Sequence, residues 1–286
     1  MEKNMRDDFK KFCDDVAEYL RNAYVEATVS LTEVIKNNGL VLTGVNVKFP
    51  ETNAAPTFYL DKFFDEGKTT SEVVEFIKRQ VSKPRPNIEI SFISDWSLVK
   101  NKIRGSLLNA ELNKVKEQRW PYRRISGDLN LFYKIVMEVD DDGEGSIQVS
   151  NELMKIWNVS EKDLFDAFCE NDTFIGFESI LEILGEMMGG LNPFGEEEPP
   201  LYVLTNKTKC FGASVIANPA AMHEMKEEIM KKCGDEEFYV IPSSVHELLL
   251  IPKKDFASCE GITSMIKEIN ATQLAAEEVL SDHPYI

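Results

Sequence analysis

The chain has 286 residues, a net charge of −17 and a hydrophobic content of 43%. That length fits one large domain or two small ones, and that apolar fraction excludes a disordered chain. No apolar stretch reaches the roughly 18 residues that a membrane-spanning helix needs, so we expect no membrane attachment. The charged first residues lack the apolar segment of a secretion signal, which favours the cytoplasm.

Five cysteines are scattered along the chain, and no two have the Cys-x-x-Cys spacing of a zinc or redox site. An odd number of dispersed cysteines indicates reduced thiols in a cytoplasmic protein, not a framework of disulfides. They are Cys13, Cys169, Cys210, Cys233 and Cys259.

The negative charge is concentrated in the C-terminal part of the chain. Residues 1–126 contain 21 Lys and Arg against 18 Asp and Glu, a net charge of +3. Residues 127–286 contain 11 against 31, a net charge of −20. Such an acidic region repels nucleic acids and anionic membranes, and it favours a basic protein partner. The basic stretch 100–124 is a candidate partner within the same chain.

Hydrophobic periodicity and turn residues predict the elements of the N-terminal region. Apolar residues at helical spacing predict a helix over 7–22, and an Asn-Asn-Gly turn predicts a hairpin over 25–49. The remaining predicted elements are a strand at 57–60, a helix at 69–81 capped by Ser71, a strand at 88–93 and a basic helix at 97–120.

The polar, proline-containing stretch 119–127 predicts a boundary between two α+β regions. They are residues 1–126, which are nearly neutral, and the acidic residues 127–286. The elements predicted after the boundary are strands at 129–139 and 146–149, helices at 151–157, 160–170 and 177–188, and a loop at 189–200.

Residues 201–252 have the clearest element boundaries in the chain. They predict strand, turn, strand, helix, strand, turn and strand in that order. Asn218 followed by Pro219 begins the helix and Gly234 ends it, and a last helix is predicted over 258–270. Hairpins with irregularly placed helices predict an α+β fold with mixed or antiparallel sheets, not a doubly wound parallel sheet.

The turn Ser243-Ser244-Val245-His246-Glu247 is the strongest candidate for chemistry. Ser244 and His246 fall on one side of an extended chain and Glu247 on the other, and a hydroxyl beside a base is the minimum for covalent catalysis. A hydrolase or transferase is therefore one alternative function. The glycine-flanked elbow of a hydrolase is missing, so a structural histidine beside a serine-rich turn is the interpretation that we favour.

His223 and Glu227 lie four residues apart on the predicted helix, a spacing that places two metal ligands on one face. A complete site needs further ligands, such as His246 or His283. Three histidines this dispersed favour a surface pair instead, and we expect no metal and no other cofactor.

Nucleic-acid binding through residues 100–124 is the second alternative function. Only Trp120 and Tyr122 accompany the basic residues there, whereas single-strand binders interleave aromatic side chains with their cations. We therefore expect a non-catalytic protein that acts through contacts with other proteins, and nucleic acid is not the expected partner.

Seven short segments carry a resemblance to a known family. They are Val41–Val45, Pro56–Leu60, Trp157–Ser160, Tyr202–Asn206, Phe211–Ala213, Ile241–Glu247 and Val279–His283. Together they resemble an uncharacterised family from gut Gram-positive bacteria, the domain of unknown function 5688. The resemblance extends from residue 25 to the C-terminus. It implies a bacterial cytosolic protein, and it brings no activity, cofactor or catalytic residue.

Overall fold

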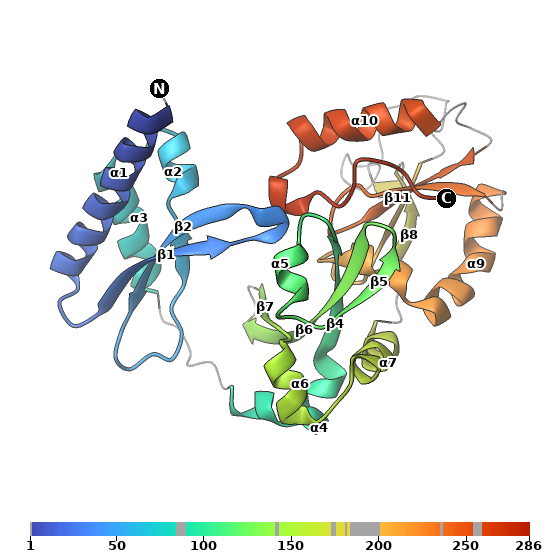
Figure 1. Ribbon diagram of the computed structural model, residues 1–286, viewed down its shortest axis with the longest axis horizontal. Coiled ribbons are helices and arrows are strands. Elements are labelled where there is room, and N and C mark those ends of the chain that lie inside the picture. The colour runs from blue at the N-terminus through green and yellow to red at the C-terminus, as the bar shows by residue number, and fades with distance from the viewer. Residues whose placement is uncertain are drawn as a thin grey trace. The chain divides into compact units, whose positions relative to one another are not determined.

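The computed structural model describes residues 2–83, 90–140, 143–172, 176–180, 182–183, 201–234, 237–253 and 259–286. The chain forms two compact units, residues 1–90 and 91–286. Figure 1 draws the first unit in blue to cyan and the second in cyan-green to red. The predicted loop at 189–200 lies outside the described residues. None of the described helices is both long and apolar enough to cross a membrane.

The first unit packs helices on a three-stranded antiparallel sheet of order β1-β2-β3. Its elements are α1 (Glu2–Ala23), β1 (Thr28–Ile35), the 3-10 turn η1 (Asn37–Gly39), β2 (Val41–Lys48), β3 (Thr57–Tyr59), α2 (Asp61–Asp65) and α3 (Thr70–Val81). Helix α1 contacts α3, β1 and β2, and Leu20, Val45 and Ile77 are fully buried between them. The predicted hairpin over 25–49 and the helix over 7–22 are confirmed.

The second unit begins with short helical turns and a sheet built around one long strand, β6. Its elements are η2 (Ser91–Ser94), α4 (Trp96–Val99), η3 (Lys100–Lys102), β4 (Ile103–Asn109), α5 (Lys114–Glu117), β5 (Tyr122–Ser126), β6 (Leu129–Asp140), β7 (Gly143–Gln148), α6 (Asn151–Trp157) and α7 (Glu161–Asn171). Strand β6 pairs antiparallel with β4, β5 and β7. Helix α7 packs on β4, and Leu131, Leu164 and Phe168 are fully buried in this core.

A second antiparallel sheet of order β10-β11-β9-β8 completes this unit. Its elements are β8 (Gly176–Ser179), β9 (Tyr202–Thr205), the 3-10 helix η4 (Gly212–Ala217), α9 (Pro219–Cys233), β10 (Phe238–Ile241), β11 (Leu248–Pro252), α10 (Cys259–Thr272) and η6 (Ala276–Glu278). Helix η4 contacts both β4 and β9, so it links the two sheets. All three sheets of the described chain are antiparallel, which confirms the predicted α+β fold built from hairpins and packed helices.

Strand β4 corrects the prediction of a basic helix over 97–120. Six of its seven residues are buried, and Arg104 is the exception. A strand buried on both faces does not show the alternation of apolar and polar residues that marks a half-buried strand, so periodicity does not separate it from a helix. The strand predicted at 88–93 is also wrong where it is described, because Ser91–Ser94 forms η2.

Two further predicted elements differ in the second unit. Residues 176–179 form strand β8 instead of the start of a helix over 177–188, because β9 offers a free edge for pairing. The second strand predicted within 201–252 is the 3-10 helix η4. The boundary predicted near residue 126 falls in the turn between β5 and β6, and the polar residues there form a hairpin rather than a linker.

Two glycines allow the close packing around η4. A Cβ atom on Gly105 would lie 2.7 Å from Phe168 Cε2. A Cβ atom on Gly212 would lie 2.1 Å from Thr205 Oγ1, 2.5 Å from the His246 carbonyl oxygen and 2.7 Å from the Asn206 amide nitrogen. Two of the three atoms facing Gly212 belong to the backbone, so this site cannot relax by rotating a side chain.

We expect Gly212→Ala to destabilise the protein by on the order of 3 kcal/mol, because the added methyl group overpacks a site walled by backbone. Gly127→Ala is the matched control, since a Cβ atom there meets nothing within 4 Å. Urea denaturation of both variants measures the difference. Equal stability of the two variants would contradict this account of the packing.

Candidate functional site

A polar cleft of about 510 Å³ lies in the second unit between β4, β6, the end of α7 and the loop 206–211. We call it the Asp172 cleft. Its lining residues are Arg104, Gly105, Lys134, Val136, Ser146, Asn171, Asp172, Asn206, Lys207, Thr208, Cys210 and Phe211. The cleft therefore gathers a carboxylate, a guanidinium and two amines from segments far apart in the sequence.

Asp172 is the least favourably placed charge in the cleft. It is the C-cap of α7 and is only 7% exposed. Within the described residues its carboxylate takes part in no hydrogen bond and no ion pair. Burial raises the pKa of this carboxyl, although Arg104 and Lys134 act in the opposite direction. The negative end of the α7 dipole also disfavours a carboxylate at this position.

Arg104 lines the same cleft, and part of its guanidinium group has no hydrogen-bond partner among the described residues. Its Nη1 atom donates to the carbonyl oxygens of Ile103 at 2.9 Å and Asn101 at 3.2 Å. Its Nε and Nη2 atoms donate to no group in the described part of the chain. This Nε–Nη2 edge is the fork that binds carboxylates in a bidentate manner.

Lys134 adds a buried cation on the β6 side of the cleft. The residue is 6% exposed, and its Nζ atom lies 2.9 Å from the centroid of the Phe211 ring. The negative face of an aromatic ring stabilises an ammonium group removed from water. Lys134 and Phe211 thus form a wall of the cleft in which charge and apolar surface are adjacent.

The loop 206–211 is held in place by its own hydrogen bonds. Asn206 donates from Nδ2 to the carbonyl oxygen of Cys210 and accepts at Oδ1 from the hydroxyl of Thr208. Phe211 has a φ of 53°, a left-handed conformation that is unfavourable for an aromatic residue. Its amide donates to Nδ1 of His246 at 3.2 Å, which compensates part of this strain.

His246 therefore has a structural partner in the loop of the cleft. Because Nδ1 accepts a hydrogen bond, the neutral ring carries its proton on Nε2, which faces Oε1 of Glu278 at 3.7 Å. The hydroxyl of Ser244 accepts from the backbone amide of His246 at 3.0 Å. No hydrogen bond joins this hydroxyl to the imidazole among the described groups. The amide of Ser244 donates to the carbonyl oxygen of Glu247, which closes the turn.

The cluster predicted at 243–247 is thus close in space but is not arranged as a nucleophile bonded to its base. Catalysis by Ser244, His246 and Glu247 stays a prediction. Sequence reasoning missed Glu278 as the acidic neighbour of His246. No local signal could identify it, because 32 positions of sequence separate residues 246 and 278.

The candidate metal ligands do not come together. His223 and Glu227 are exposed on α9, and Glu227 lies 4.0 Å from Lys231 in an ion pair. Among the described residues, no group of three His, Cys, Asp or Glu side chains is placed to hold a metal ion. His223, His246 and His283 each have different surroundings.

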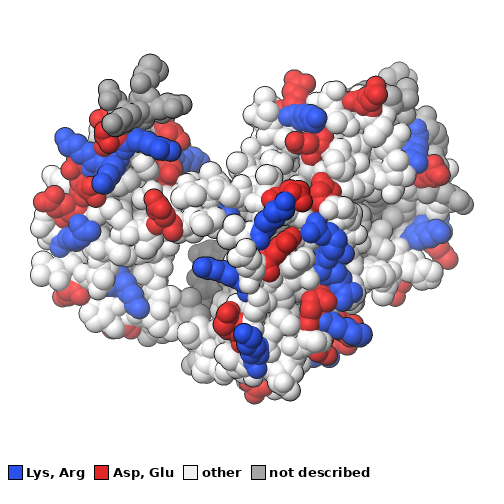
Figure 2. Space-filling model, viewed as in Figure 1, with Lys and Arg blue, Asp and Glu red and all other residues white. Residues whose placement is uncertain are grey.

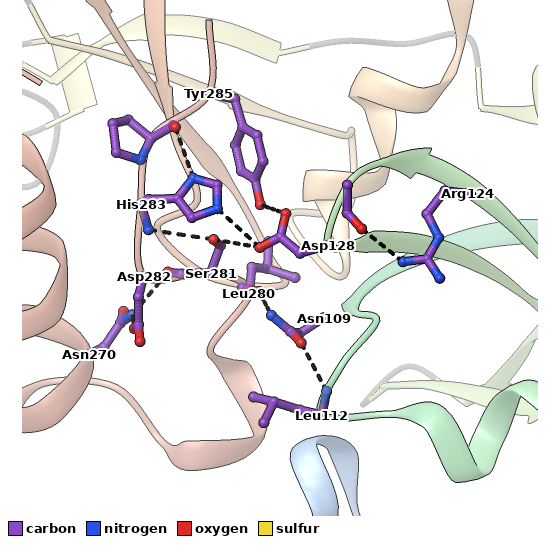
Figure 3. Close-up of polar contacts among 12 residues, drawn as sticks. Asn109, Leu112, Arg124, Asp128, Asn270, Leu280, Ser281, Asp282, His283 and Tyr285 are labelled. Atoms are coloured by element: carbon purple, nitrogen blue, oxygen red, sulfur yellow. Dashed lines mark hydrogen bonds and ion pairs between the residues drawn. The ribbon is translucent and has the colours of Figure 1, made fainter.

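His283 belongs to a cluster that fastens the C-terminal residues to the turn between β5 and β6 (Figure 3). Asp128 accepts from the hydroxyls of Ser281 at 2.9 Å and Tyr285 at 2.6 Å, and lies 3.3 Å from Nε2 of His283. Burial and the neighbouring carboxylate raise the pKa of Tyr285. The serine contacts the acid directly, with no histidine between them, so this arrangement is a structural clasp and not a catalytic triad.

At least four of the eight basic residues in the stretch 100–124 form ion pairs inside their own unit. Lys100 pairs with Glu170 and Arg123 pairs with Glu161, each at 2.9 Å. The neighbouring pairs are Lys114–Glu111 and Arg124–Glu117. Figure 2 shows basic and acidic side chains interleaved on the drawn face of the second unit. Two of these pairs, those with Glu170 and Glu161, join the stretch to the acidic half, and all four leave fewer cations for a phosphate backbone.

The raised pKa of Asp172 predicts the sign of a pH effect on stability. The pKa of such a carboxyl is higher in the folded state than in the unfolded state. Below the unfolded pKa the group is neutral in both states and does not affect stability. Stability then falls as the pH rises from the unfolded pKa through the folded pKa. We expect Asp172→Asn to raise the free energy of unfolding at about pH 7, because the neutral amide replaces a buried charge. At about pH 3, below the ordinary aspartate pKa of about 3.9, the gain should vanish.

Urea denaturation at the two pH values measures this effect. Glu224→Gln is the control, because Glu224 is exposed on α9 and lies outside the cleft. A loss of stability in Asp172→Asn at neutral pH would show that the carboxylate has a partner after all.

The family model for a family of unknown function, DUF5688, matches residues 9–286. No curated protein and no solved structure matches the chain. The match includes most of the first unit, all of the second unit and every lining residue of the Asp172 cleft. It also confirms the resemblance seen in the seven short segments. The chain belongs to the family of unknown function DUF5688.

Proposed function

We propose that this chain is a binding protein that acts without covalent chemistry, and that its ligand enters the Asp172 cleft. One observation carries the proposal. A buried carboxylate and an open guanidinium edge line the same cleft, and within the described residues they pair neither with each other nor with a third group. A buried charge without a partner destabilises a fold, and such groups concentrate at functional sites.

The surroundings of the candidate nucleophiles support binding over turnover. The hydroxyl of Ser244 is engaged by a backbone amide, and Cys210 lines the cleft with no hydrogen bond from its thiol to a base in the part of the chain described. Covalent catalysis requires a nucleophile and a base in contact. A regulatory role through reversible binding is the simplest function consistent with this geometry.

The bacterial cytoplasm is the proposed location of this function. The four cysteines whose side chains are described, Cys13, Cys169, Cys210 and Cys259, are free thiols. Burial raises the pKa of Cys13 to about 12, so this thiol is protected from oxidation. Free thiols are the normal state of cysteine in a reducing compartment.

Native mass spectrometry tests the proposal after the protein is incubated with a filtered small-molecule extract of bacterial cells. We expect the wild type to retain a small molecule and to release it with unchanged mass on denaturation. Arg104→Gln and Asp172→Asn should retain at least tenfold less, whereas Arg119→Gln, at an exposed position outside the cleft, should match the wild type.

Three outcomes would count against a binding function at this cleft. They are the absence of any retained molecule, equal retention by all four proteins, and release of a chemically altered compound. The last outcome would favour the hydrolase or transferase alternative.

The charge of the second unit favours a second candidate function, contact with a basic protein. Carboxylates dominate α10 and the residues that follow it, and the sequence from 259 to 286 contains one lysine, Lys267. The carboxylates are Glu260, Glu268, Glu277, Glu278 and Asp282. A surface with this excess attracts a basic partner over a Debye length of about 10 Å at an ionic strength of about 0.1 M.

Fluorescence anisotropy with a labelled lysine- and arginine-rich peptide tests this second candidate. We expect binding at about 50 mM salt that weakens strongly by about 300 mM, because screening shortens the reach of exposed charges. Glu260→Lys combined with Glu268→Lys should weaken it further, and Glu224→Gln on α9 serves as control. If neither salt nor charge reversal changes the affinity for the peptide, the contact is not electrostatic.

A further inference from the structure

Arg104 and Asp172 carry opposite charges and line the same cleft, and each has hydrogen-bonding atoms that no group of the described residues occupies. Arg104 offers its Nε and Nη2 atoms, which suit the two oxygens of a carboxylate. Asp172 as a residue is only 7% exposed, and its carboxylate accepts no hydrogen bond among the described residues. The two side chains influence each other electrostatically but form no ion pair.

A ligand that carries only a negative or only a positive charge would pair with Arg104 or with Asp172, but not with both. An anion on Arg104 would approach the carboxylate of Asp172 and repel it, because charges of equal sign interact strongly where water is excluded. A cation on Asp172 would be repelled by Arg104 and Lys134, which lie close enough to affect the ionisation of Asp172. A ligand that carries both charges places a group of opposite sign on each of Arg104 and Asp172.

The size and the remaining walls of the cleft fit a small molecule. Its volume of about 510 Å³ falls within the range of roughly 300 to 1,000 Å³ that is usual for small-molecule sites. Val136 and the ring of Phe211 add apolar surface beside the charged groups. Such apolar surface can contact an apolar part of the ligand, while the charged groups fix the orientation of the ligand.

We propose that the ligand is a small zwitterion of the α-amino acid type, with its carboxylate on Arg104 and its ammonium group on Asp172. This inference rests on the proposed function and adds the chemical class of the ligand. The carboxylate forms two charge-assisted hydrogen bonds with the guanidinium edge, and the ammonium group supplies the donors that the buried carboxylate lacks.

Isothermal titration calorimetry with the twenty common α-amino acids tests this proposal. For the amino acid that binds most tightly, two derivatives serve as matched probes: the N-acetyl form, which lacks the ammonium group, and the amine, which lacks the carboxylate. We expect each derivative to bind at least tenfold more weakly. Arg104→Gln and Asp172→Asn should each reduce the affinity at least tenfold, and Arg119→Gln and Glu224→Gln should leave it unchanged.

Failure of this inference can be separated from failure of the proposed function. If no amino acid binds while the extract experiment still yields a retained molecule, the cleft binds a ligand of another class and the zwitterion is excluded. Equal affinity for the N-acetyl form would exclude the contact with Asp172. Circular dichroism verifies folding of each variant, and the two derivatives decide the question even if Arg104→Gln fails to fold.

Discussion

The second unit depends on one buried side chain amide, that of Asn218. It is fully buried, and its Nδ2 atom donates to the carbonyl oxygens of Cys169 at 3.0 Å and Asp172 at 2.8 Å. Its Oδ1 atom accepts from the amide of Ala221 and caps α9. One residue thus fixes the end of α7 and the start of α9, and it satisfies backbone groups at both helix ends. The position of Asp172, and with it the cleft, follows from these three bonds.

This anchoring holds Asp172 where a carboxylate is least stable. Burial and the helix dipole both oppose its ionisation, and the two nearby cations offset this only in part. Arg104 donates from Nη1 to two backbone carbonyl oxygens and forms no ion pair with the acid within the described residues. The strained backbone of Phe211, held by His246, closes the cleft from the loop side. The fold therefore holds Arg104 and Asp172 in one cleft without an ion pair between them. A ligand with both charges would give each of them a partner.

Local signals predicted much of the fold, and tertiary packing decided the rest. The helix from Pro219 to Cys233 was predictable, because Asn218 caps it, Pro219 occupies its first turn and Gly234 ends it in the left-handed conformation. Near residue 70 two hydroxyl side chains compete as caps, and Thr69, not Ser71, forms the capping box with Glu72. Strand β4 and strand β8 were missed because their partners, β6 and β9, are distant in sequence.

The candidate site was less predictable than the fold. The serine and histidine of 243–247 stand out in the sequence, whereas Asp172 and Arg104 look like ordinary surface charges at a helix end and in a basic stretch. Their importance comes from burial and from missing partners, and both are properties of the folded chain. The same holds for Glu278 and Asp128, whose partners lie on other segments.

The most direct measurement of the central claim is an NMR titration of the Asp172 side-chain carboxyl, assigned by comparison with Asp172→Asn. We predict that in the free protein this carboxyl titrates at a higher pH than an ordinary aspartate. Saturation with the best-binding amino acid should lower its pKa, because an ammonium group then contacts it. An ordinary titration that the ligand leaves unchanged would contradict the claim that Asp172 is an unpaired, ligand-binding carboxylate.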